Sequence, residues 1–109
     1  MQITESKAGA VTVLAMEGRL ETGSAPQAEA TLLARLDDGS VVADLSALRY
    51  VSSAGLRVLL SAAKLAKARQ HGFALCALQP PVREVLAISG FDRIIAVHPG
   101  RAEALAALG

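Results

Sequence analysis

The feature that constrains the fold most is a continuous apolar run that leads within a few residues into a helical pattern. The run is SVVADL, residues 40–45, and leucines and alanines with helical spacing follow from Gly55 onward. A strand that is apolar on both faces is typical of the interior of a parallel sheet, where helices cover both sides. The sequence therefore predicts an α/β fold with this strand inside the sheet.

Strand and helix patterns alternate on both sides of this unit. The predicted elements are strands at 1–6 and 10–18 joined by a turn in SKAG, a helix capped by Ser24 with Pro26 in its first turn, the strand at 40–45, a helix from Gly55 to Gln70 closed by Gly72, a strand at 73–78, a helix at 79–90 closed by Gly90, a strand at 93–97 and a helix at 101–108. This order predicts a single domain over residues 1–109. Its sheet is mixed but mostly parallel, with about five strands and about four helices.

Composition removes several classes of function. The apolar fraction of 52% supports a real core, and the formal charge of +1, with both signs interspersed, does not favour a nucleic-acid binder. Cys76 is the only cysteine, and no group of residues has metal-ligand spacing, so we expect no disulfide, metal or cofactor. No apolar run reaches the ~20 residues that span a bilayer, and the first residues do not resemble a signal peptide. We therefore expect a cytoplasmic protein without membrane insertion.

Two adjacent serines, Ser52 and Ser53, lie where the central strand passes into the helix at Gly55. Loops that follow the strands of such a sheet share one edge. The segments GRLETGS, SALRYVSSAG, LQPP and HPG are therefore predicted to lie along that edge. One serine is enough to cap a helix, so capping alone leaves the second serine unexplained.

Catalysis by either serine is the least favoured interpretation. A nucleophilic serine needs a base within hydrogen-bond reach, and His71 is on the order of 24 Å away along the helix. His98 could lie at the correct edge, but Asp92, the nearest acid to it in sequence, is predicted at the opposite one. The chain also has no G-x-S-x-G motif and no phosphate-binding loop.

Three separate segments resemble one known family. The segment VVADLSALRYVSSAGLRVLL resembles the central signature of STAS domains, the anti-sigma-factor antagonists. The segment VTVLAMEGRLETGSAPQ resembles their second strand and Gly-x-Leu-Asp loop, and PVREVLAISGFDRIIAV resembles their proline-started helix and last strand. Three matches in the right order are far more specific than one short motif.

The resemblance implies a regulatory binding module, not an enzyme. It places the family's phosphorylated serine at Ser53, with Ser52 where the family usually has aspartate and Glu21 as the acid of the loop. The unphosphorylated domain is then expected to bind an anti-sigma factor that is also a serine kinase. Phosphorylation of Ser53 would release that partner, and a serine phosphatase would reset the switch. The implied partner-binding residues are Glu21, Thr22, Ser52, Ser53, Ala54, Gly55, Leu56 and Arg57.

Two questions stay open from the sequence. The same family includes subunits of transport systems, such as the small cytoplasmic component of a lipid-exporting complex, which would dock an ATPase without phosphorylation. Arg57, Lys64 and Lys67 form either a basic strip beside the switch or a solvated helix face. The remaining conspicuous side chains are interpreted as packing residues, namely Tyr50, Phe73, Cys76 and Phe91.

Overall fold

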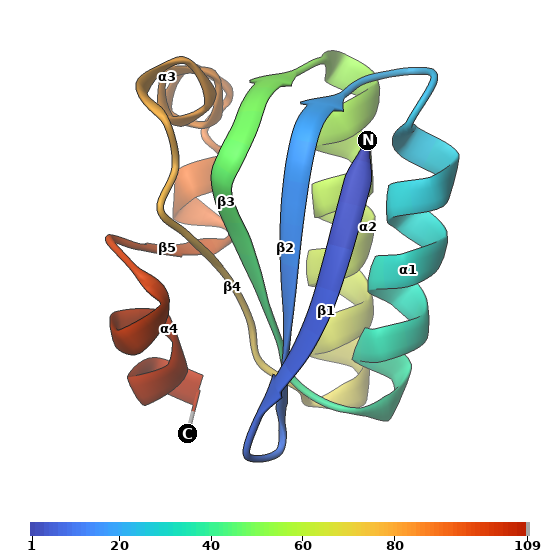
Figure 1. Cartoon of the computed structure of the whole chain (residues 1–109), viewed down its shortest axis with the longest axis vertical. Helices are drawn as coiled ribbons and strands as arrows, with labels where there is room; N and C mark the ends of the chain where they lie inside the picture. The colour runs from blue at the N-terminus through green and yellow to red at the C-terminus, as the bar shows by residue number, and fades with distance from the viewer. Residues whose placement is uncertain (109) are drawn as a thin grey trace.

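The computed structural model describes residues 1–108 and contains a five-stranded sheet in the order β1-β2-β3-β4-β5 (Figure 1). The elements are β1 (Gln2–Ala8), β2 (Val11–Leu20), α1 (Ala25–Asp38), β3 (Val41–Val51), α2 (Ser53–Arg69), β4 (Phe73–Cys76), α3 (Pro80–Ser89), a short 3₁₀ helix η1 (Phe91–Arg93), β5 (Ala96–His98) and α4 (Arg101–Leu108). β1 pairs antiparallel with β2, and all the other strand pairs are parallel. The predicted α/β class, the mixed sheet and the helix count are confirmed.

Helices cover the sheet unequally. α1 and α2 lie side by side on one face (Figure 1), and α3 packs into the same core through Val82 and Leu86, whereas α4 covers the other face. The main core contains Leu14, Leu32, Leu59 and Leu75, all fully buried. A smaller cluster of mostly small residues lies beneath α4.

Three of the four predicted packing residues lie where expected. Phe73 is in the main core, and Phe91 is half-buried against it. Cys76 is buried in β4, and its burial raises the pKa of the thiol to about 11, so the thiol stays protonated at neutral pH. The fourth, Tyr50, is not a packing residue: 39% of it is exposed.

The central strand is longer than the sequence predicted. β3 continues through SALRY to Val51, whereas the predicted strand ended at Leu45. Two register shifts against β2 give β3 extra residues, between Ala15 and Glu17 and again between Gly18 and Arg19. Such bulges shift the in-and-out alternation of side chains, so this segment does not show the pattern of a strand in the sequence.

Several predicted boundaries are also wrong. The turn predicted at SKAG lies later, because Ser6 and Lys7 pair within the β1–β2 hairpin and Gly9 (φ 63°) makes the turn. α2 begins at Ser53 and ends at Arg69, and its C-cap residue, Gln70 (φ 58°), adopts the left-handed conformation predicted for Gly72. Gly90 closes α3 as predicted.

The last predicted strand, 93–97, is mostly 3₁₀ helix and turn, and only Ala96–His98 pair with β4. The prediction that Asp92 and His98 lie at opposite edges is wrong as well, because both line one cavity of about 280 Å³. Across residues 1–108, no helix is long and apolar enough to cross a membrane.

An ion pair between Arg101 and Asp44 links the start of α4 to β3 of the sheet. Asp44 of β3 has a side chain only 9% exposed, and it accepts hydrogen bonds from the Ser46 backbone N–H (2.9 Å) and the Arg101 guanidinium (2.5 Å). Burial by itself raises the pKa of the Asp44 carboxyl. The hydrogen bonds from Ser46 and Arg101 outweigh burial, and the pKa is lowered. The charged form is therefore stabilised in the folded protein.

We predict that Asp44→Asn lowers the free energy of unfolding by about 1–2 kcal/mol at pH 7, because it removes a charge-assisted hydrogen bond. Because the pKa of the Asp44 carboxyl is lower in the folded than in the unfolded protein, its charge stabilises the fold at pH values above the unfolded pKa, near 4. This stabilisation is lost as the pH falls through the folded-state pKa. The difference between variant and wild type should therefore shrink below about pH 4, as measured by urea unfolding.

Asp37→Asn is the matched control, because Asp37 pairs with Arg69 at 2.7 Å but 55% of its side chain is exposed. We expect it to change stability by less than about 1 kcal/mol. A gap between Asp44→Asn and wild type that stays constant from neutral to acid pH would contradict this account of the ion pair.

Candidate functional site

The candidate site is the edge of the sheet where β2 and β3 end together. Leu20 and Val51 are paired as the last residues of their strands. The Ser52 N–H then donates to the Leu20 carbonyl at 2.9 Å, which extends the strand pairing by one residue into the turn. The loop after β2 and the start of α2 are therefore held side by side.

Gly55 makes this close approach feasible. It is buried, and a Cβ atom at its position would lie 2.5 Å from the Leu20 carbonyl oxygen and 2.8 Å from Leu20 Cγ. Real Cβ atoms do not approach that closely, and the backbone oxygen cannot turn aside. Gly55 therefore lets the first turn of α2 lie directly on the end of β2.

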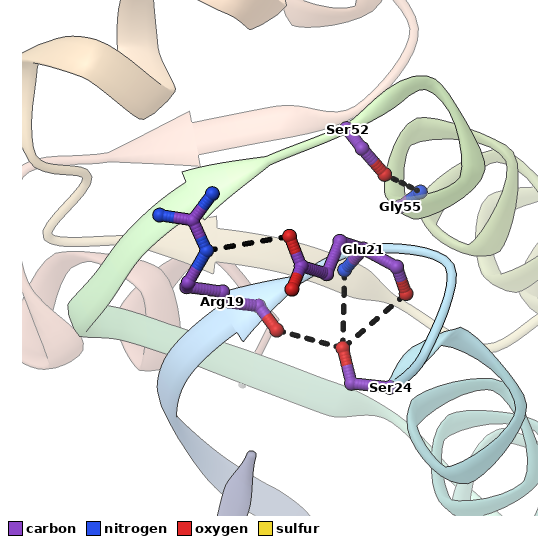
Figure 2. Close-up of polar contacts among 5 residues, drawn as sticks. All are labelled: Arg19, Glu21, Ser24, Ser52 and Gly55. Carbon is purple, nitrogen blue, oxygen red and sulfur yellow. Dashed lines mark hydrogen bonds and ion pairs between the residues drawn. The ribbon is translucent and has the colours of Figure 1, made fainter.

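The two serines have different roles. Ser52 is the N-cap of α2, and its Oγ accepts a hydrogen bond from the Gly55 N–H at 3.2 Å (Figure 2). Ser53 is the first residue of the helix and is exposed. Its hydroxyl makes no hydrogen bond with any residue of the described chain, 1–108. Ser52 thus satisfies the helix end and leaves the Ser53 hydroxyl free.

The loop that follows β2 is organised by Ser24. Its hydroxyl lies 2.7 Å from the Arg19 carbonyl and accepts the Glu21 N–H at 3.0 Å (Figure 2). Ser24 is the N-cap residue of α1, as predicted, but its side chain makes no capping hydrogen bond. Its hydrogen bonds instead fix the shape of the Glu21–Ser24 loop beside α2.

Sequence reasoning missed a polar stack beside this loop. The Arg19 guanidinium lies 4.3 Å from the centre of the Tyr50 ring, and its Nε is 3.3 Å from Glu21 Oε2. Arg19 and Tyr50 are cross-strand neighbours, but this pairing follows only from the bulges in β3. Tyrosine and arginine are enriched where binding energy concentrates in interfaces, so both belong with the candidate surface.

Not all of the residues that the resemblance singled out share one environment. Thr22, Ala54 and Arg57 line a groove of about 630 Å³ between α1 and α2. Glu21 is half-buried beside Arg19, and Leu56 is half-buried against the core. The exposed members are Thr22, Ser53 and Arg57. Gly55 lies beneath them and supports the surface from inside.

The site offers little for catalysis or metal binding among the residues that the structure describes. Neither the Ser52 nor the Ser53 hydroxyl is hydrogen-bonded to a histidine or a carboxylate. No group of three or more His, Cys, Asp or Glu within 1–108 could hold a metal ion. What the site presents is a free hydroxyl at the positive end of a helix dipole.

We predict that Gly55→Ala destabilises the fold by about 2–3 kcal/mol, because the new methyl group overlaps the Leu20 carbonyl. Gly23→Ala is the control, since a Cβ there meets nothing within 4 Å, and we expect a change within about 0.5 kcal/mol. Thermal and urea unfolding measure both. Equal stability of the two variants would show that the close approach of α2 to β2 is not required.

Comparison with known proteins agrees with this geometry. The model of the STAS domain family matches residues 2–104. BtrV of Bordetella bronchiseptica, which carries the provisional name of an anti-sigma factor antagonist, is 43% identical over 109 residues, covering 98% of this chain and 94% of that one. An anti-sigma factor antagonist of Mycobacterium paratuberculosis has a crystal structure with 25% identity and a TM-score of 0.89, covering 98% of this chain and 92% of that one. A STAS domain protein from Planctomyces limnophilus, also described as an anti-sigma-factor antagonist, has 27% identity and a TM-score of 0.86, covering 98% and 97% of the two chains. The resemblance drawn from the three motifs is thus confirmed, and this chain belongs to the STAS domain family.

Proposed function

We propose that this chain is an anti-sigma-factor antagonist that binds a kinase-type anti-sigma factor and is released when Ser53 is phosphorylated. The observation that carries the proposal is the free, exposed Ser53 hydroxyl at the start of α2, beside a neighbour that already caps the helix. The names of the STAS relatives support the class of partner. The exposed hydroxyl supports the position of the switch.

The start of α2 can accept a phosphate without refolding. A phosphoserine adds roughly −1.5 to −2 charges at neutral pH, and negative charge is favourable at a helix N-terminus. The first turn of α2 contains no acidic residue, so the positive end of the dipole is not already neutralised. Arg57 lies one turn along and has no ion-pair partner within 1–108, so its guanidinium is free to approach the phosphate.

Ser52 fits this role although it stands where the family usually has aspartate. The structural demand on that position is a hydrogen-bond acceptor for the Gly55 N–H, and a hydroxyl meets it. A neutral cap also leaves the helix end without a permanent negative charge. The phosphate on Ser53 would then be the only anion within the first turn of α2, which makes the difference between the two states larger.

The partner responds to the same change in the opposite way. A partner surface that packs around a neutral hydroxyl would have to bury a dianion without offering any compensating charge of its own, which is costly. In the proposed cycle the kinase transfers the γ-phosphoryl group of ATP to Ser53 Oγ, the serine proton is lost and ADP leaves. A phosphatase hydrolyses the ester and restores binding. The chain itself acts as substrate and binding module.

We predict that Ser53→Asp weakens binding to the anti-sigma factor by at least a hundredfold, because it places an unpaired charge in the interface. Thermal stability should stay within about 1 kcal/mol of wild type, since aspartate suits the first turn of a helix. Ser53→Ala should bind within a fewfold of wild type. Isothermal titration calorimetry measures the affinities. Wild-type affinity for Ser53→Asp would contradict a switch at this position and favour a docking role without phosphorylation.

A further inference from the structure

A single stripe of exposed polar residues, with the half-buried Leu60 among them, runs along α2 from the proposed switch. Its members are Ser53, Arg57, Leu60, Lys64 and Lys67, spaced alternately by four and three residues. Residues at these spacings lie on one face of an α-helix. At 1.5 Å per residue the stripe is about 21 Å long, or about four turns. A surface of this size exceeds what a switch at Ser53 alone requires.

This stripe is strongly basic. α2 contains four cations and no acidic residue. Arg69 pairs with Asp37 at 2.7 Å, whereas Arg57, Lys64 and Lys67 have no ion-pair partner within residues 1–108. The whole chain carries a formal charge of only +1, so this face concentrates charge that the rest of the molecule balances.

Two hollows flank the same stripe, one on each side; the hollow toward α1 has a mixed lining that includes Glu29 of α1 as well as apolar side chains. The groove of about 630 Å³ toward α1 and a second hollow of about 530 Å³ share Leu60 and Lys64. The second hollow also includes Ala63, Lys67 and Ile94. Ile94 is 59% exposed, although a large aliphatic side chain gains free energy when it is buried. An exposed apolar surface edged by unpaired cations is typical of a docking site.

We propose that this face of α2 docks an acidic amphipathic helix of the anti-sigma factor. The occupant follows from charge and shape: apolar side chains of the helix fill the hollows on either side of Leu60, and its carboxylates lie over Arg57, Lys64 and Lys67. Amphipathic helices commonly bind apolar grooves in this way. The identity of the partner rests on the proposed function, whereas the chemistry of its helix rests on the surface of α2.

This arrangement also couples docking to the switch. Ser53 stands at one end of the stripe, so a phosphate there repels an acidic helix that occupies the rest of it. Unpaired like charges across an interface disfavour binding. Phosphorylation would therefore act twice, by blocking the hydroxyl contact and by opposing the docked helix.

The test uses two variants with matched controls. Lys64→Glu combined with Lys67→Glu reverses the charge of the stripe, and Lys7→Glu reverses an exposed lysine on β1. Ile94→Ser removes the exposed side chain that lines the second hollow, and Ile88→Ser removes an isoleucine of α3 that is 79% exposed. Melting temperatures of all four verify that each variant is folded.

Two probes are titrated: the purified anti-sigma factor, and a synthetic helical peptide of about 16 residues with leucines on one face and glutamates on the other. We expect the lysine pair and Ile94→Ser each to weaken both by about tenfold, with the lysine effect reduced at high salt, while the controls bind like wild type. Unchanged affinity of both variants for both probes would overturn the proposal.

Other occupants of this face are also tested. If Lys64, Lys67 and Ile94 were instead required for binding to vesicles with roughly a third anionic phosphatidylglycerol, or for self-association in sedimentation, the proposed occupant would be wrong. The two proposals fail separately. Peptide binding that depends on the stripe supports the docking face even if Ser53→Asp binds the anti-sigma factor normally, which would contradict only the switch.

Discussion

The hydrogen bond from the Ser52 N–H to the Leu20 carbonyl is the contact on which the site depends. It joins the ends of β2 and β3 and sets the first turn of α2 against Leu20, at a distance that only glycine allows at position 55. The Glu21–Ser24 loop, the Ser53 hydroxyl and the start of the groove take their positions from it. The switch proposed at Ser53 could therefore change charge while the backbone beneath it stays in place.

Two adjacent serines separate a structural role, shown for Ser52, from the regulatory role that we propose for Ser53. The Ser52 hydroxyl is engaged with the Gly55 N–H, so the helix end is satisfied whatever happens at the next residue. The Ser53 hydroxyl is exposed and supports nothing in the fold. We therefore expect a phosphate added to it to affect folding little and to affect binding of the proposed partner strongly. A partner-switching module, as proposed, needs a modification that its own fold accepts and that its partner's surface cannot accommodate.

Much of the architecture could be predicted from the sequence, because the spacing of apolar residues and the glycines and prolines at element ends act over a few residues. The leucine pattern of α2, Pro26 at the start of α1 and Gly90 at the end of α3 each act within a few residues. The bulges of β3 could not be predicted, since they depend on pairing with β2 and erase the alternation in SALRY. The stack of Arg19 on Tyr50 was missed for the same reason. The position of Ser53 was predicted from family resemblance, whereas the division of roles between the two serines required the geometry.

The central claim is that Ser53, not the capping Ser52, accepts the phosphate. The most direct measurement is peptide mass spectrometry after incubation with ATP and the anti-sigma kinase that the unphosphorylated chain binds. The account predicts one phosphate, located on Ser53, absent from Ser53→Ala and retained by Ser52→Ala despite a loss of about 0.5–2 kcal/mol of stability. Phosphate on Ser52, or undiminished incorporation into Ser53→Ala, would contradict it.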